Sequence, residues 1–277
     1  MNLRSRPLIL LFGDSITQQG FGWPPSTVGW ASFLARDYAR RADVVNRGFS
    51  GYNTQHAVEI LASLFAAPQE NVSNNNAQQQ VLFTTVFFGA NDAALPGELQ
   101  HVPVERYGQN LATIVHEMKK NLHPWMGSNQ TTTSSSCLTV EYSLPVVLMT
   151  PPPVDIDAWY KERGMPSGGQ PNNSRANENA KLYGEMVKQV GKDLNCSVLD
   201  VFALLGGNGS VDQYGKHLRD GLHLSESGNE LVYQGLMKLI QEEHAHLMPM
   251  MDGNGKYGTQ GVPLEGNLWR EMCNRET

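Results

Sequence analysis

Short apolar runs alternate with longer amphipathic segments along most of the chain. The runs are rich in β-branched and aromatic residues, as buried strands are, and they occupy residues 8–13, 42–48, 81–90, 145–153 and 196–205. Three longer segments repeat their apolar residues at intervals of three and four, which predicts helices with one buried face over 29–43, 104–122 and 176–194.

This alternation predicts an α/β fold. Strands that are apolar throughout are buried on both faces, so helices must cover both sides of a parallel sheet. We expect a three-layer α/β/α domain over residues 1–247, with a flavodoxin-like, doubly wound sheet of about five parallel strands. The segment 248–277 is Gly-rich with late apolar residues, and we expect it to pack on this domain or on a second copy of the chain.

Two polar stretches of low complexity, residues 71–80 and 127–137, interrupt the pattern. Their composition predicts surface loops, since they hold little apolar surface to bury. Residues 128–136 are therefore expected to be dispensable for folding.

The first apolar run admits another interpretation, because Arg4 and Arg6 precede it as in a secretory signal. However, the run Leu8 to Phe12 is short for the core of a signal peptide and far short of a membrane span. No small-x-small cleavage motif follows it. We interpret it as a first strand that ends in a sharp turn at Gly13-Asp14-Ser15.

Composition narrows the class of protein. The chain has 277 residues, 40% of them hydrophobic, and a net charge of -6. These values suit one large globular domain, although two small domains stay possible. The absence of a basic block argues against nucleic acids and anionic membranes as partners.

The remaining candidate ligands and motifs suggest neither a metal nor a cofactor. Cys137, Cys196 and Cys273 are too few and too widely spaced for a disulfide framework or a metal cluster, which favours a reducing, cytoplasmic location. His244 and His246 offer two metal ligands without the rest of a set, and a solvated helix face is the simpler interpretation. No phosphate-binding glycine motif follows a predicted strand.

Polar clusters stand where the predicted strands end. They are Gly13-Asp14-Ser15, Gly48 to Gly51, Gly89 to Asp92, and the segment "RDGLHLSESGN" at 219–229. Each alone is ordinary turn or helix-cap chemistry, and Asp220 and His223 in particular could cap the last helix. Together they mark one edge of the sheet, because the carboxyl ends of parallel strands meet there and ligands bind at that edge.

The combination resembles the SGNH hydrolase superfamily, the GDSL-type lipases and esterases. "FGDSIT" resembles its serine block, "GFSGYNT" its glycine block, "GAND" its asparagine block and "DGLHLSESG" its Asp-x-x-His block. The resemblance covers roughly residues 7 to 245 and is greatest to the isoamyl acetate-hydrolysing esterase group. Ile16 replaces the leucine of the GDSL motif, an exchange within an apolar position.

The resemblance implies roles for these residues. A serine hydroxyl needs an adjacent base, so Ser15, His223 and Asp220 are expected to form a triad. The N–H of Ser15, the N–H of Gly51 and the side-chain amide of Asn91 are the expected oxyanion donors. Gly48 is the less probable glycine, and Asp14 and Asp92 are expected to position loops.

The resulting expectation is a cofactor-independent serine esterase that acts on small acetyl-type esters through an acyl-serine. The same site would also suit a carbohydrate deacetylase, an acyl-thioesterase or a lysophospholipase. A non-catalytic binding module is a rival of another class, but all four blocks retain their reactive residues. The expected partners are a small-molecule ester and, in a homodimer, a second copy.

Overall fold

The structure is a computed structural model that describes residues 6–65, 80–125, 143–164 and 174–249. The predicted loop at 127–137, including the dispensable segment 128–136, lies outside the described residues, as do Cys137, Cys273 and the tail from residue 250. Of the predicted loop at 71–80, Gln80 alone is described and it begins a strand.

The centre of the molecule is a parallel six-stranded sheet. Its order is β2-β1-β3-β5-β6, with the short β4 paired to β3, and all neighbours are parallel. The strands are β1 (Leu8–Gly13), β2 (Asp43–Gly48), β3 (Gln80–Phe87), β4 (His123–Pro124), β5 (Val146–Met149) and β6 (Ser197–Leu199). Four of the six lie within the predicted runs, β3 begins one residue before its run, and no pattern in the sequence predicted the two-residue β4.

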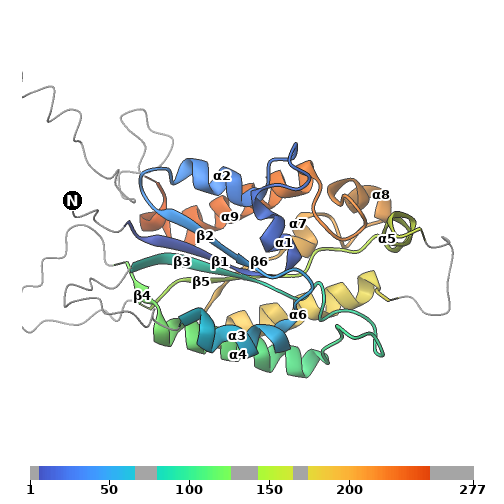
Figure 1. The fold of residues 1–277 in the computed structure, drawn as a ribbon, viewed down its shortest axis with the longest axis horizontal. Helices are drawn as coiled ribbons and strands as arrows, with labels where there is room; N and C mark the ends of the chain where they lie inside the picture. The colour runs from blue at the N-terminus through green and yellow to red at the C-terminus, as the bar shows by residue number, and fades with distance from the viewer. Residues whose placement is uncertain (1–5, 66–79, 126–142, 165–173, 250–277) are drawn as a thin grey trace, which may run out of the picture.

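Helices cover both faces of the sheet, so the predicted three-layer α/β/α fold is confirmed (Figure 1). The α-helices are α1 (Ser15–Gln18), α2 (Trp30–Asp37), α3 (Thr54–Phe65), α4 (Val104–Asn121), α5 (Ile156–Glu162), α6 (Asn177–Asp193), α7 (Val201–Leu204), α8 (Val211–Tyr214) and α9 (Glu226–Glu243). The 3₁₀ helices are η1 (Gln19–Phe21), η2 (Gly215–His217) and η3 (Ala245–Leu247). Helices α2 and α9 lie on one face, and α3, α4 and α6 lie on the other.

Two buried clusters result from the alternation of side chains along the strands. In β1, Ile9 and Leu11 pack into the cluster that includes α2 and α9, whereas Leu10 and Phe12 pack into the cluster that includes α3, α4 and α6. Each fully buried side chain of this size contributes about 1.5–3 kcal/mol of transfer free energy. The strand β1 thus contributes side chains to the buried clusters on both faces of the sheet.

The predicted fifth strand, 196–205, is wrong in its second half. Only Ser197–Leu199 form a strand, and Asp200 then begins α7 by accepting a hydrogen bond from the backbone N–H of Ala203 at 3.0 Å. A short apolar run does not by itself distinguish a strand from a short buried helix. The aspartate cap decides the outcome here.

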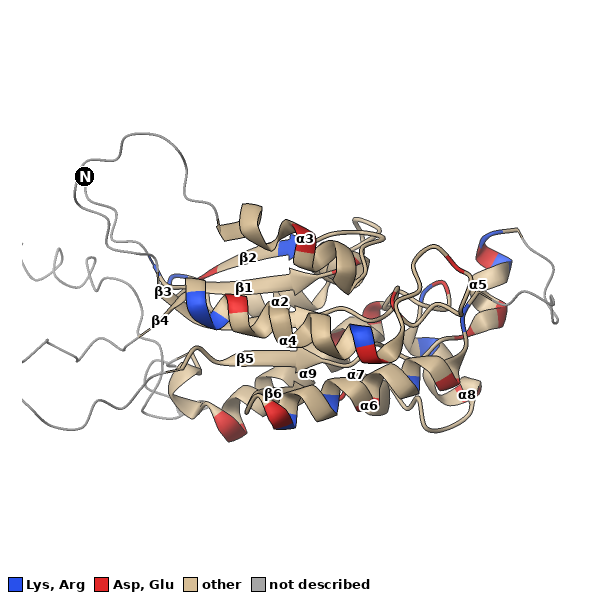
Figure 2. Cartoon of the chain, turned by 90° about the horizontal axis from the view of Figure 1, so that it is seen from below, with Lys and Arg blue, Asp and Glu red and all other residues tan. Residues whose placement is uncertain are grey.

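Charges of both signs share the surface of α4 and α6 in the view of Figure 2. Among the described residues, no helix combines the length and the apolar character needed to cross a membrane.

Candidate active site

Ser15 stands at the carboxyl end of β1, where α1 begins. Asp14 follows the last residue of β1 and caps α1, because its carboxylate accepts a hydrogen bond from the backbone N–H of Ile16 at 2.9 Å. Gly13 leaves no room for a side chain, because a Cβ there would lie 2.5 Å from the carbonyl oxygen of Phe87. The contact at Gly13 fixes the end of β1 against β3, and the cap at Asp14 makes Ser15 the first residue of the helix.

Asp220 and His223 lie on one tight loop. The loop is closed by a bridge between Leu218 and Leu224 and by a hydrogen bond of 2.7 Å from the N–H of Arg219 to the carbonyl oxygen of His223. Gly221 has a φ of +86°, and a Cβ there would lie 2.2 Å from the carbonyl oxygen of Asp155. Only glycine fits this turn, which packs against the segment that follows β5.

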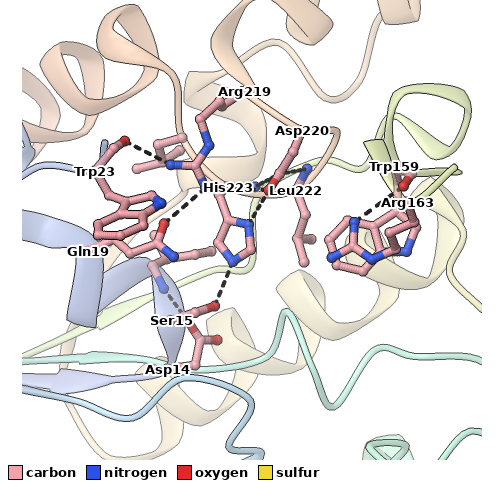
Figure 3. Close-up of polar contacts among 12 residues, drawn as sticks. Asp14, Ser15, Gln19, Trp23, Trp159, Arg163, Arg219, Asp220, Leu222 and His223 are labelled. Atoms are coloured by element: carbon pink, nitrogen blue, oxygen red, sulfur yellow. Dashed lines mark hydrogen bonds and ion pairs between the residues drawn. The ribbon is translucent and has the colours of Figure 1, made fainter. Parts of the chain in front are cut away.

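The structure brings the three predicted side chains into one hydrogen-bonded chain (Figure 3). Ser15 Oγ lies 2.9 Å from His223 Nε2, and His223 Nδ1 lies 2.7 Å from Asp220 Oδ2. The other oxygen of Asp220 accepts hydrogen bonds from the N–H groups of Leu222 and His223. Burial alone would raise the pKa of the Asp220 carboxyl, but its bonds to His223 and to these N–H groups hold that pKa well below its ordinary value.

Helix capping does not explain this loop. Helix α9 is capped by Ser225, whose hydroxyl accepts a hydrogen bond from the N–H of Gly228 at 3.4 Å. The alternative role for Asp220 and His223 as the cap of the last helix is therefore wrong. Asp220 instead orients the imidazole of His223 toward Ser15.

The three expected oxyanion donors follow neighbouring strands, β1, β2 and β3. Gly51 has a φ of +82°, which favours glycine at this turn. Within the described residues, neither the N–H of Ser15 nor the N–H of Gly51 has a protein acceptor. The side-chain N–H₂ of Asn91 donates one hydrogen bond, to the carbonyl oxygen of Tyr52 at 2.8 Å, and keeps a second hydrogen available.

Comparison with known proteins identifies the family of the chain. The model of the GDSL-like lipase/acylhydrolase family matches residues 11–231, most of the chain. The chain belongs to this family. As a GDSL-family member it is a carboxylic ester hydrolase of the esterase type.

Similar proteins of the family include animal and plant esterases. The human isoamyl acetate-hydrolyzing esterase 1 homolog is 36% identical over 87% of this chain and 84% of its own length. A GDSL esterase/lipase of Arabidopsis thaliana is 34% identical over 86% of each chain. A lipase/acylhydrolase structure from Enterococcus faecalis superposes with a TM-score of 0.56 at 24% identity, over 88% of this chain and 99% of that one. The acetylxylan esterase of Geobacillus stearothermophilus gives a TM-score of 0.55 at 20% identity, over 87% and 96% of the two chains.

Buried carboxyl groups support the loops of this GDSL esterase, as the sequence predicted. Asp92 is fully buried and accepts hydrogen bonds from the N–H of Thr54 at 2.8 Å and from its hydroxyl at 2.5 Å, which fixes the start of α3. Burial raises the pKa of Asp14 to about 7 and that of Asp92 to about 6. Neither carboxyl contacts His223, so both act on the framework.

Gly48 of the esterase serves packing. A Cβ at this position would lie 2.0 Å from the backbone nitrogen of Gln18, so β2 touches the end of α1 there. Asn46 strengthens the same contact by donating to the carbonyl oxygen of Thr17 at 2.6 Å. This separates Gly48 from Gly51, whose N–H has no protein acceptor in the described structure.

Several neighbours of the triad in the esterase were not foreseen from the sequence. Arg219 forms an ion pair of 3.4 Å with Asp220 and donates to the carbonyl oxygen of Trp23 at 2.8 Å. Trp23 is 56% exposed, and Figure 3 shows it on the opposite side of His223 from Trp159. The ring of Trp159 lies 6.3 Å from that of His223. Arg219 lies in the segment 219–229, but no motif marked its contacts, and Trp23 and Trp159 reach the site from the segment before α2 and from α5.

His244 and His246, the two candidate metal ligands near the end of α9, differ in their surroundings. His244 ends α9 half-buried and contacts Ser197 Oγ through Nε2 at 2.8 Å, so it is not the solvated residue expected, whereas His246 is exposed. Within the described residues of the esterase, no three His, Cys, Asp or Glu side chains gather as a metal site.

Proposed function

We propose that the enzyme cleaves short-chain, acetyl-type carboxylic esters through an acyl-serine intermediate. The chain of contacts from Ser15 through His223 to Asp220 carries this proposal. Ser15 Oγ attacks the carbonyl carbon of the ester while His223 Nε2 takes its proton. His223 then returns that proton to the leaving alcohol oxygen as the C–O bond breaks, and an acyl-serine remains.

Water completes the cycle. His223 Nε2 removes a proton from a water molecule, whose oxygen attacks the acyl carbon, and Ser15 leaves as the protonated hydroxyl with release of the carboxylic acid. Asp220 stays ionised throughout, in keeping with its depressed pKa, and stabilises the imidazolium formed in each half.

Negative charge develops on the carbonyl oxygen in both halves. The N–H of Ser15 lies at the positive end of the first turn of α1, and the N–H of Gly51 and the amide of Asn91 come from the adjacent loops. Donors that are fixed before the reaction stabilise this oxygen most in the transition state.

The proposed acyl group rests on the relatives. The human relative is named for isoamyl acetate, and the structurally similar Geobacillus enzyme for acetylxylan. Both names share a two-carbon acyl group and differ in the alcohol. We therefore expect the acyl side to be selective and assign no alcohol.

A fluorophosphonate probe and a p-nitrophenyl ester series test the proposal together. The probe should modify Ser15, as located by mass spectrometry, and kcat/KM should be highest for the acetate and fall with acyl length. Ser15→Ala should lose labelling and turnover, while Ser197→Ala, which alters a serine that contacts His244 Nε2, should keep both. Labelling at a different serine would refute the nucleophile, and a maximum at long acyl chains would refute the acetyl assignment. Equal preference for acetylated sugars would favour the carbohydrate deacetylase.

A further inference from the structure

A buried cation lies beneath the loop that carries Asn91. Arg175 is only 4% exposed, and its side chain lies between the loop that carries Asn91 and the ring of Trp159. Burial lowers the pKa of its guanidinium to about 10, so it keeps its charge at neutral pH. In the described part of the chain, no carboxylate approaches it within ion-pair distance. An arginine buried without an acidic partner is costly, and its contacts must explain its position.

The guanidinium donates to three acceptors. They are the carbonyl oxygen of Ala90, Asn91 Oδ1 at 3.2 Å and Gln100 Oε1 at 3.0 Å. Trp159 covers its face, with the ring centroid 4.9 Å from the guanidinium carbon. Two of the three acceptors thus belong to the Gly-Ala-Asn-Asp block.

These contacts decide which way the amide of Asn91 points. A guanidinium only donates, so the atom facing Arg175 must be the amide oxygen. A carbonyl oxygen only accepts, so the atom facing Tyr52 must be the amide nitrogen. With both ends fixed, the remaining N–H of Asn91 has one direction in which to donate.

A second connection reaches the glycine loop. Gln100, whose amide oxygen accepts from Arg175, donates through Nε2 to the carbonyl oxygen of Gly51 at 2.9 Å. The backbone of Gln100 is itself held, since its carbonyl oxygen accepts from Asn53 Nδ2 at 3.0 Å. A single guanidinium nitrogen, Nη2, therefore bonds to Asn91 and, through Gln100, is linked to Gly51.

We propose that Arg175 is a positioning residue that sets two oxyanion donors, Asn91 directly and Gly51 through Gln100. This inference rests on the proposed function, in which these donors bind the oxyanion. Arg175 does not touch the reacting atoms. It holds the amide and the turn in the orientation that the transition state requires, and its charge favours electron density on that side of the site.

Arg175→Lys is the principal test, because it keeps a cation but removes the planar fork that reaches Asn91 and Gln100 at once. We expect kcat per active site to fall about 10- to 100-fold, the scale of a misplaced catalytic group, with KM within about threefold. Active sites are counted by fluorophosphonate labelling, so loss of folded protein lowers the count and leaves kcat per site unchanged. Arg163→Lys is the matched control: Arg163 also stacks on Trp159 but is exposed and has no contact with either loop in the described structure, and its kcat should stay within about twofold.

A double-mutant cycle separates the outcomes. Asn91→Ala alone should lower kcat about 10²- to 10³-fold. The double variant with Arg175→Lys should lose clearly less than the product of the two single losses, because Arg175 acts partly through Asn91. Multiplicative losses, or an Arg175→Lys kcat within twofold of wild type, would overturn the inference.

The failure of the proposed function has a different signature. If Asn91→Ala keeps the wild-type kcat, the amide is not an oxyanion donor, whatever Arg175 does. Should Arg175→Lys give no labelled protein, Gln100→Met removes the link to Gly51, together with one acceptor of Arg175, and leaves the contact of Arg175 with Asn91. It should lower kcat per site about 3- to 10-fold, a fraction of the effect of losing a donor, and an unchanged kcat would contradict the link.

Discussion

Two contacts between a serine hydroxyl and a histidine Nε2 lie at opposite ends of the sheet. Ser15 and His223 meet at 2.9 Å beyond the carboxyl end of β1, and Ser197 and His244 meet at 2.8 Å where β6 begins. The distances are equivalent, but the surroundings are not. His223 Nδ1 contacts a carboxylate, whereas His244 has no hydrogen bond to one in the described structure.

The backbone around the two serines differs as well. Ser15 begins a helix beside N–H groups that find no protein acceptor among the described residues, while Ser197 begins a strand. Burial lowers the pKa of His244, and in the described part of the chain no carboxylate bonds to its ring as Asp220 does to that of His223. The reactivity of a serine–histidine pair thus depends on a carboxylate beside the histidine and on unbonded N–H groups beside the serine. In this fold both lie at the carboxyl end of the sheet, where ligands of parallel sheets bind.

Replacing each histidine in turn tests the difference between the two pairs and has the largest expected effect on kcat. His223→Ala should lower kcat about 10⁵- to 10⁶-fold, because the serine loses its base. His244→Ala should keep kcat within about twofold, since only a hydrogen bond to Ser197 is lost. Steady-state kinetics on p-nitrophenyl acetate measure both, and a large loss in His244→Ala would mean that the amino end contributes to catalysis.

Replacing Asp220, the carboxylate that contacts His223, tests why the two serine–histidine pairs differ. Asp220→Asn should lower kcat about 10⁴-fold, because an amide N–H₂ facing Nδ1 favours the imidazole tautomer that carries its proton on Nε2. That tautomer cannot accept the proton of Ser15. Arg219→Gln is the control, since it removes the ion pair but not the carboxylate. If Asp220→Asn retained most of kcat, the orientation of His223 would not depend on Asp220.

Buried charge also distinguishes the two ends. All charged side chains that are buried in the described structure, Asp14, Asp92, Arg175 and Asp220, lie at the carboxyl end.

Stability should depend on pH through Asp14. Its pKa is 3.8 in the ordinary state and about 7 in the fold, so between these values the folded chain holds a proton that the unfolded chain has released. The free energy of unfolding therefore falls as pH rises through this window. Asp14→Asn does not titrate, and its Tm relative to wild type should increase from about pH 5 to about pH 8, by about 2–4 °C for each kcal/mol.

The exposed Asp212 provides the matched control for this measurement. Asp212→Asn should show a Tm difference from wild type that is the same at both pH values. If Asp14→Asn behaves in that way too, the carboxyl of Asp14 is not held protonated by burial.

Residues that follow strands were the predictable part of the site. Ser15, Gly51 and Asn91 each come a few positions after a buried run, so topology alone places them at one edge. Arg175 and Gln100 follow no strand. The contacts of Arg175 join positions 75 to 85 residues apart, and the contact of Gln100 with Gly51 joins positions 49 apart. No periodic pattern encodes such contacts, which depend on how separate loops pack.

The fold shows the same division. The long helices carry periodic apolar faces and were predicted to within a few residues at α4 and α6, whereas α2 ends at Asp37, well short of the predicted limit at residue 43. The run 196–205 was misassigned in its second half because a short apolar run fits a strand or a short helix equally well, and the cap at Asp200 begins a helix. A cytoplasmic location, a second copy as partner and the role of segment 248–277 stay predictions, since the described residues do not report on them.

The contact between Ser15 and His223 joins residues 208 positions apart. On a translating ribosome, the proposed nucleophile emerges first and the proposed base among the last parts of the domain. A nascent chain of this esterase therefore stays catalytically silent until strands from both halves have been synthesised and paired. Ester cleavage is in this sense a late reporter of folding, and its first appearance during synthesis would time the closure of the whole sheet.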